Sequence, residues 1–106
     1  MLNLERIAEY ESIFGRDKMK FLFDEFIKSA DEGFIKLEKA DENEARIVVH
    51  SIKSAAKVFG MDEFANICGE IENKLVEGEK IRELEFLIKS AKMLYNEQLE
   101  EFKRIF

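Results

Sequence analysis

The sequence predicts an all-α fold, an antiparallel up-down-up-down four-helix bundle with a short extra helix at its N-terminal end. The 106 residues include no proline and only five glycines, so helices can run without interruption between a few glycine stops. Apolar residues recur at steps of three and four along most of the chain, which is the period of an amphipathic helix. Hydrophobic residues make up 46% of the chain, enough for a single domain spanning 1–106 to bury a core.

The first two helices are predicted on either side of Gly15. Residues from about 3 to 14 form a brief amphipathic segment, which we interpret as a lid on the bundle. Gly15 can end this segment in a left-handed turn. From about 17 to 39, apolar residues spaced three and four apart predict one buried helical stripe, formed by Met19, Leu22, Phe23, Phe26, Ile27, Ala30, Phe34 and Leu37.

The next helix is predicted over residues 42–59. Asp41 is followed three residues later by Glu44, a pattern that resembles a capping box at a helix N-terminus. Gly60 is the predicted stop, because glycine readily adopts the left-handed conformation that ends helices.

The last two helices are predicted over 61–77 and 79–105, separated by Gly78. Phe64, Cys68, Ile71 and Leu75 lie along one face of the first of them. The second would reach about 28 residues, or about 40 Å at 1.5 Å per residue, so we expect it to overhang the bundle. Its apolar stripe comprises Leu84, Leu87, Ile88, Ala91, Tyr95, Leu99, Phe102 and Ile105.

Charge and cysteine content exclude several classes of function. The net charge of -6 and the lack of a basic run argue against a nucleic-acid partner. No apolar stretch approaches the length of a membrane span, so we expect no membrane partner and a cytoplasmic protein or domain. Cys68 is alone, which excludes an intrachain disulfide, and its place on an apolar stripe predicts a buried small hydrophobe, not a redox sensor.

The only histidine, His50, is predicted to point away from the core. On a helical wheel, His50 falls about 160° from the centre of the buried face. The buried face itself falls within about 60° of that centre and comprises Ala45, Val48, Val49, Ile52, Ala55, Ala56 and Phe59. The imidazole should therefore project into solvent from the middle of a helix.

Three cations surround this histidine in an otherwise acidic chain. Arg46 lies one turn before His50, and Lys53 and Lys57 lie beside it. An exposed imidazole is a competent nucleophile toward phosphorus, and adjacent cations can neutralise phosphoryl oxygens. Lys53, three residues on, is best placed to reach a group on an outward ring nitrogen, for which we expect Nε2. A lone surface histidine near lysines more often has no function, so the wheel alone does not assign this role.

A longer segment resembles a known signature. His50-Ser-Ile-Lys53-Ser-Ala-Ala-Lys-Val-Phe-Gly60 resembles the motif of histidine phosphotransfer (HPt) domains, in which lysine follows the histidine by three residues and glycine by ten. Downstream, Met61-Asp-Glu-Phe64 and Cys68-Gly-Glu-Ile-Glu72 look like the next helix of that family. The resemblance extends over essentially the whole chain.

The resemblance implies a phosphorelay carrier that is not itself an enzyme. His50 would accept a phosphoryl group from a receiver-domain aspartate and pass it to another receiver, and Lys53 would stabilise the phosphorylated state. The expected partners are response-regulator receivers, with a hybrid histidine kinase as a further candidate. No cofactor is expected on this chain, since no Gly-rich nucleotide loop or Mg²⁺ cage is evident; Mg²⁺ would belong to the receiver.

The residues expected at the docking surface are Arg46, Ile47, Ser54, Lys57 and Gly60. Arg46 and Lys57 would steer an acidic partner. Ile47 and Val58 border the outward face and could pack under the first helix or contact a receiver. Ser54 stands where the family often has glycine, so it could narrow partner choice or hydrogen-bond the phosphoryl group.

Two other functions stay open at this point. The chain could be a structural or adaptor bundle in which His50 is incidental. It could also be the phosphoacceptor domain of a larger chemotaxis-type or hybrid kinase. A metal site is less favoured, because a single histidine without cysteines or neighbouring carboxylates on its face offers too few ligands.

Overall fold

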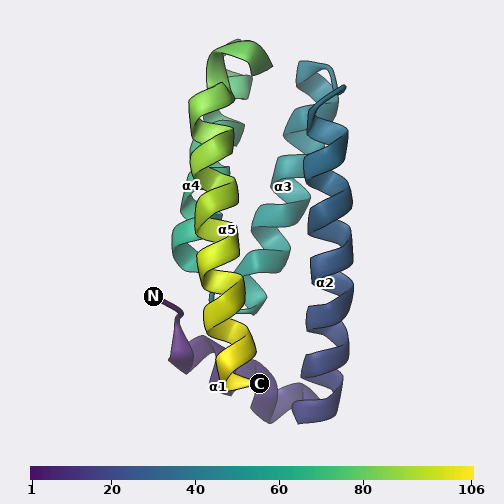
Figure 1. Ribbon diagram of the computed structural model, residues 1–106, viewed down its shortest axis with the longest axis vertical. Coiled ribbons are helices and arrows are strands. Elements are labelled where there is room, and N and C mark those ends of the chain that lie inside the picture. The colour runs from purple at the N-terminus through teal and green to yellow at the C-terminus, as the bar shows by residue number, and fades with distance from the viewer.

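The computed structural model describes all 106 residues as an antiparallel helical bundle with one short 3₁₀ turn (Figure 1). The predicted up-down-up-down topology is confirmed. No helix combines the length and the apolar character needed to cross a membrane. The elements in chain order are α1 (Leu4–Phe14), α2 (Arg16–Leu37), α3 (Glu42–Val58), α4 (Asp62–Val76), η1 (Ile81–Leu84) and α5 (Glu85–Ile105).

The short helix α1 lies across one end of the bundle, and both chain ends lie at that same end (Figure 1). Gly15 joins α1 directly to α2 with a φ of 83°, which an L side chain rarely adopts. A Cβ at Gly15 would meet no neighbouring atom, so the turn needs glycine for its conformation alone. The helix α1 is therefore a separate short helix that a one-residue turn joins to α2.

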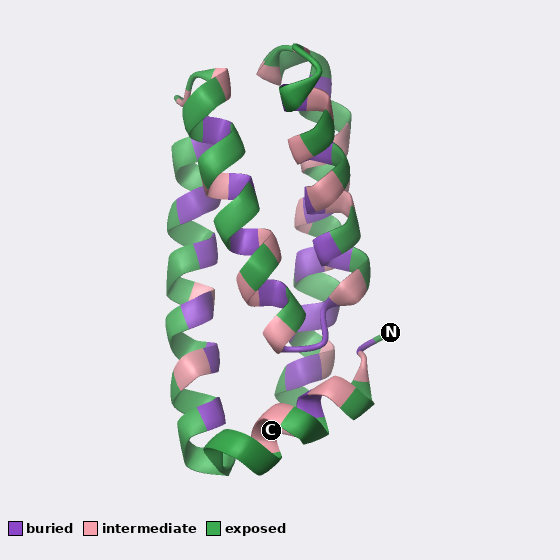
Figure 2. Ribbon diagram, turned by 180° about the vertical axis from the view of Figure 1, so that it is seen from behind, coloured by how far each residue is buried: buried purple, intermediate pink, exposed green.

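The core runs along the sides of α2 to α5 that face one another, as the buried residues in Figure 2 show. Its lower part is a cluster of aromatic rings from α2, α5 and the residue that caps α3. The ring of Phe102 in α5 stacks on Phe23 of α2 with centroids 4.0 Å apart and meets Phe59 edge-on at 5.6 Å. Such packed aromatic contacts hold the helices at fixed distances from one another.

The helix α3 packs between α2 and α4, and this arrangement fixes which side of it faces solvent. Gly33 of α2 allows the closest approach, since a Cβ at that position would come within 2.8 Å of Ile52 Cδ1 on α3. Because two neighbouring helices hold its flanks and its buried face lies in the core, α3 has one exposed strip along its outer side.

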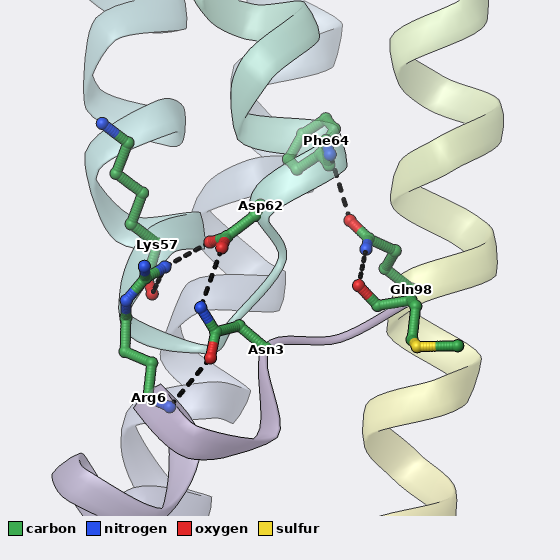
Figure 3. A network of polar contacts seen from close by, with 7 residues as sticks. Asn3, Arg6, Lys57, Asp62, Phe64 and Gln98 are labelled. Atoms are coloured by element: carbon green, nitrogen blue, oxygen red, sulfur yellow. Dashed lines mark hydrogen bonds and ion pairs between the residues drawn. The ribbon is translucent and has the colours of Figure 1, made fainter.

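Buried polar groups in the bundle are paired. Gln98 of α5 is almost fully buried, and its Oε1 accepts a hydrogen bond of 3.0 Å from the backbone N–H of Phe64 (Figure 3). Because α4 begins without a side-chain cap of its own, Gln98 satisfies one of its free N–H groups from a neighbouring helix. The hydroxyl of Tyr95 likewise donates to Asp31 on α2 at 3.2 Å.

The last helix differs from its predicted range of 79–105. Gly78, with a φ of 98°, ends α4, and residues 81–84 form the 3₁₀ turn before the α-helix begins at Glu85. The Lys80 N–H donates to Glu83 Oε1 at 2.8 Å, so capping within this short turn occupies residues that the periodicity assigned to the helix.

The expected overhang of the last helix is also wrong. The 21 residues of α5 span about 31 Å, and its final turn is covered. Phe106 stacks on Phe102 with ring centroids 4.7 Å apart, and the Arg16 guanidinium lies 4.4 Å from the Phe106 ring centroid. Arg16 also donates to the Ile105 carbonyl at 3.0 Å, which ties the start of α2 to the end of α5.

Cys68 is buried in α4, as its apolar surroundings predict. Burial raises the pKa of the Cys68 thiol to about 12, despite the opposing charge of Lys53. A thiol that stays protonated and inaccessible behaves as a small core residue and does not act as a redox sensor.

Candidate functional site

His50 lies in the middle of α3 on its exposed strip, with 60% of its side chain accessible. The residues predicted for the opposite face are buried or half-buried, with Ala45, Val49, Ile52 and Ala56 in the core. The outward orientation derived from the helical wheel is therefore confirmed. Because α3 is packed between α2 and α4, the middle of this helix is a rigid support for the His50 ring.

A carboxylate from the neighbouring helix joins the histidine to the lysine. Glu72 of α4 lies with one oxygen, Oε2, 2.6 Å from His50 Nδ1 and the other, Oε1, 2.5 Å from Lys53 Nζ. The Glu72 side chain is only 16% exposed, so both contacts are partly shielded from water. The three side chains form a chain of charge-assisted contacts between α3 and α4.

The state of Glu72 fixes the roles of the two ring nitrogens. The hydrogen bond from Lys53 is the largest influence on its pKa, which lies below the usual range despite the opposing effect of burial. An ionised carboxylate only accepts hydrogen bonds, so His50 Nδ1 carries a proton and donates a hydrogen bond to Glu72. In the neutral ring, Nε2 then keeps its lone pair and faces away from Glu72.

The lowered pKa of Glu72 makes the stability of the fold depend on pH. A carboxyl group whose pKa falls on folding stabilises the protein fully above its unfolded pKa of about 4.3. That contribution is lost as the pH falls through the lower pKa of the folded state. We expect the melting temperature to drop more steeply below about pH 4.3 in the native protein than in Glu72→Gln. Thermal melts of both proteins between pH 3 and 7 test this, and parallel curves would contradict it.

Lys53 is held close to the protein surface. Its side chain is 21% exposed and runs past Gly69 of α4, where an added Cβ would lie 3.7 Å from Lys53 Cδ. The neighbour that approaches Gly69 is thus the aliphatic stem of Lys53. In this structure the Lys53 ammonium is therefore paired with Glu72 of α4 and lies beside His50.

Most of the predicted docking residues lie on the surface around this group. Arg46, Ile47, Ser54 and Lys57 are all exposed, and Arg46 donates to Asn43 at 3.3 Å within its own helix. Arg46 and Ile47 line a shallow hollow of about 260 Å³ together with His50 and Glu72. The histidine thus opens onto a small depression between α3 and α4.

The prediction from the sequence that Gly60 lies on the docking surface is wrong. It is buried beneath the N-terminal segment, where its carbonyl accepts a 2.8 Å hydrogen bond from the N–H of Asn3. A Cβ at Gly60 would lie 2.6 Å from the Asn3 carbonyl oxygen, and its φ is 68°. The glycine is needed for this close approach and for the positive φ.

An apolar groove lies between α1, α2 and α3. It has a volume of about 370 Å³ and no polar atoms of consequence in its lining. Val58, whose packing the sequence left open, is half-buried on its α3 wall, whereas Ile47 remains exposed. The main lining residues are Tyr10, Phe14, Leu22, Phe26, Ala55 and Val58.

Comparison with known proteins decides the family. A model of the Hpt domain matches residues 21–104, which is most of the chain. The chain belongs to the Hpt domain family. As an Hpt domain it serves histidine phosphotransfer in phosphorelay signalling, as a carrier with receiver domains for partners. The matched residues include α3, α4 and α5 but leave out α1.

The fold of this Hpt domain is shared with a solved structure. The chain is similar to histidine-containing phosphotransfer protein B (HptB) from Pseudomonas aeruginosa PAO1, with a TM-score of 0.87 and 23% identity. The superposition covers 97% of this chain and 91% of the HptB chain. No curated protein sequence matches the chain significantly.

Proposed function

We propose that His50 is the phosphoacceptor of this Hpt domain and that Nε2 is the atom that reacts. The supporting observation is the contact between His50 Nδ1 and the ionised Glu72, which leaves the other nitrogen free on an exposed ring. A fixed tautomer on a rigid helix presents a lone pair in a constant direction, which favours in-line attack on a phosphoryl group.

The transfer step balances without a further reactant. The Nε2 lone pair attacks the phosphorus of an aspartyl phosphate, a nitrogen–phosphorus bond forms, and the phosphorus–oxygen bond to the aspartate breaks. The aspartate leaves as a carboxylate. The ring gains positive charge and keeps its Nδ1 proton, which stays bonded to Glu72. The reverse step delivers the group to the aspartate of a second receiver.

In this proposal, Lys53 and Glu72 have different roles. Glu72 orients the ring and offsets its charge after attack, as the carboxylate does in other histidine sites. Lys53 keeps Glu72 ionised and can swing its ammonium toward the phosphoryl oxygens from the same strip of α3. The Mg²⁺ ion and the acidic pocket would be supplied by the receiver, and the chain would take its phosphoryl group from that receiver and not from ATP.

The receiver would dock across the outward faces of α2 and α3. Ile47 and the apolar groove flank His50 on the side that faces α2, and Arg46 and Lys57 add positive charge nearby. An apolar helix surface next to an acidic pocket, as a receiver would offer, matches this combination in both polarity and charge. We propose one helix of the receiver as the occupant of the groove.

A charge placed at Ile47 is expected to weaken this docking. Ile47→Asp should raise the KM for the phosphorylated receiver about tenfold. Docking would strip the hydrating water from the newly introduced carboxylate, and this carboxylate would also repel the receiver's acidic pocket. Phosphorylation by the small donor phosphoramidate should not change. Met93→Asp is the matched control, because Met93 is 61% exposed against 60% for Ile47 but lies on α5, which packs mainly against α4. Equal KM values for the two variants would contradict the docking surface.

The proposed function is tested by transfer from a receiver. The protein is incubated with a ³²P-labelled receiver and Mg²⁺, and the product is treated with acid and with alkali. We expect label that is lost in acid and kept in alkali, and no label in His50→Gln. Label that persists in His50→Gln, or its absence from the native protein, would overturn the assignment.

A further inference from the structure

The N-terminal segment is fastened to the turn between α3 and α4 by a compact polar network (Figure 3). The Asn3 side chain accepts from the N–H of Arg6, which caps α1, and donates to Asp62 Oδ2 at 3.0 Å. The Arg6 guanidinium pairs with the other Asp62 oxygen and donates to the Lys57 carbonyl at 3.4 Å. We call Asn3, Arg6 and Asp62 the α1 latch.

The latch joins three elements at one point. Arg6 belongs to α1, the Lys57 carbonyl to the last turn of α3, and Asp62 to the first turn of α4. Burial is the largest single influence on the pKa of Asp62 and raises it, but the hydrogen bonds from Asn3 and Arg6 together outweigh burial and lower the pKa, so the carboxylate is ionised at neutral pH. Its charge also suits the N-terminus of α4.

Contacts along its whole length hold α1 against the bundle. Leu2 and Ile7 are buried next to the latch, and Tyr10 is partly buried against the core. At the far end, Arg16 of α2 donates to Glu11 at 3.0 Å. The latch therefore fixes the N-terminal end of α1, and together these contacts set its direction across the bundle.

The other half of α1 forms one wall of the apolar groove. Tyr10 and Phe14 stack on each other with ring centroids 5.8 Å apart, and they face Val58 and Ala55 of α3 across the groove. A change in the direction of α1 moves these two rings relative to α3 and alters the groove width.

We propose that Arg6 and Asp62 are positioning residues for docking, because their latch fixes the N-terminal end of α1 and so helps to set the groove width that the helix of a receiver must fit. The proposal rests on the proposed function for its partner. The latch does not touch His50, Lys53 or Glu72, so it acts on recognition of the receiver and leaves the reactivity of the imidazole unchanged.

The test compares Arg6→Gln, Asp62→Asn and the double variant with the native protein. The dissociation constant for an unphosphorylated receiver is measured by calorimetry, and the rate of labelling by phosphoramidate is measured separately. Lys74→Gln is the control, because it removes a half-exposed ion pair, with Glu79, at the other end of α4. Amide hydrogen exchange over residues 4–14 reports the attachment of α1.

Each latch variant should raise the dissociation constant about threefold, with faster exchange in α1 and an unchanged phosphoramidate rate. The double variant should bind no more weakly than either single one, because both break the same contact. Unchanged receiver binding in the latch variants, or an equal loss in Lys74→Gln, would overturn the proposal. A native protein that phosphoramidate fails to label would count against the role of His50, while the binding comparison would still decide the role of the latch.

Discussion

Replacing Glu72 by alanine is expected to slow transfer from a phosphorylated receiver about 10- to 100-fold, the usual loss when the group that orients a functional histidine is removed. Without the carboxylate, the proton can sit on either ring nitrogen and the ring can rotate on its exposed strip. Lys53 also loses its partner. Receiver binding should change little, so the loss should appear in kcat more than in KM.

Rapid-quench measurement of single-turnover transfer tests this expectation. Glu70→Gln serves as the control, because Glu70 lies on the same helix and is exposed, so its change removes a negative charge of α4 without touching the histidine. A rate in Glu72→Ala equal to that of Glu70→Gln would show that the carboxylate does not orient the imidazole.

Replacing Phe102 by alanine is expected to destabilise the fold by about 3–5 kcal/mol, as for other fully buried aromatic residues. The side chain has no exposed surface and joins the rings of Phe23, Phe59 and Phe106. Because domains of this size are stable by only about 5–15 kcal/mol, the melting temperature should fall by more than about 10 °C.

Denaturant titration followed by circular dichroism measures that change. Phe86→Ala is the matched control, because Phe86 lies on the same helix with 78% of its surface exposed and should cost less than about 0.5 kcal/mol. Similar losses in the two variants would contradict the assignment of Phe102 to the centre of the core.

The sequence was most informative where one helix could be read by itself. The period of three and four placed the four long helices, and the wheel of α3 placed His50 on the exposed strip and Ile52 in the core. Both are local properties, since they depend only on the geometry of a single helix. Asp41 was likewise identified as a cap from its own neighbours, and its side chain accepts from the N–H of Glu44.

Contacts between helices were beyond the same reasoning. Glu72 borders the apolar stripe of α4, between Ile71 and Leu75, and nothing in its spacing says which residue of α3 lies opposite. Its pairing with His50 depends on the register of two packed helices. The cations around His50 could be recognised because they lie on the same helix. Glu72, which binds Lys53, could not, because it lies on another helix.

The turns show a similar limit. Gly60 was recognised as a helix stop, but its burial under Asn3 follows from the path of a segment almost sixty residues away in the chain. The start of the last helix was placed too early because Lys80 and Glu83 cap a 3₁₀ turn, and capping of this kind has no hydrophobic period to reveal it.

The most direct measurement identifies the nitrogen of His50 that carries the phosphoryl group. Protein with ¹⁵N-labelled histidine is phosphorylated and studied by long-range ¹H–¹⁵N correlation and ³¹P NMR, which distinguish the two ring positions. Phosphorylation at Nε2, with the Nδ1 proton still bonded to Glu72, is the predicted result. A phosphoryl group on Nδ1 would require Glu72 to have released the ring, and it would contradict the orientation from which the transfer step is derived.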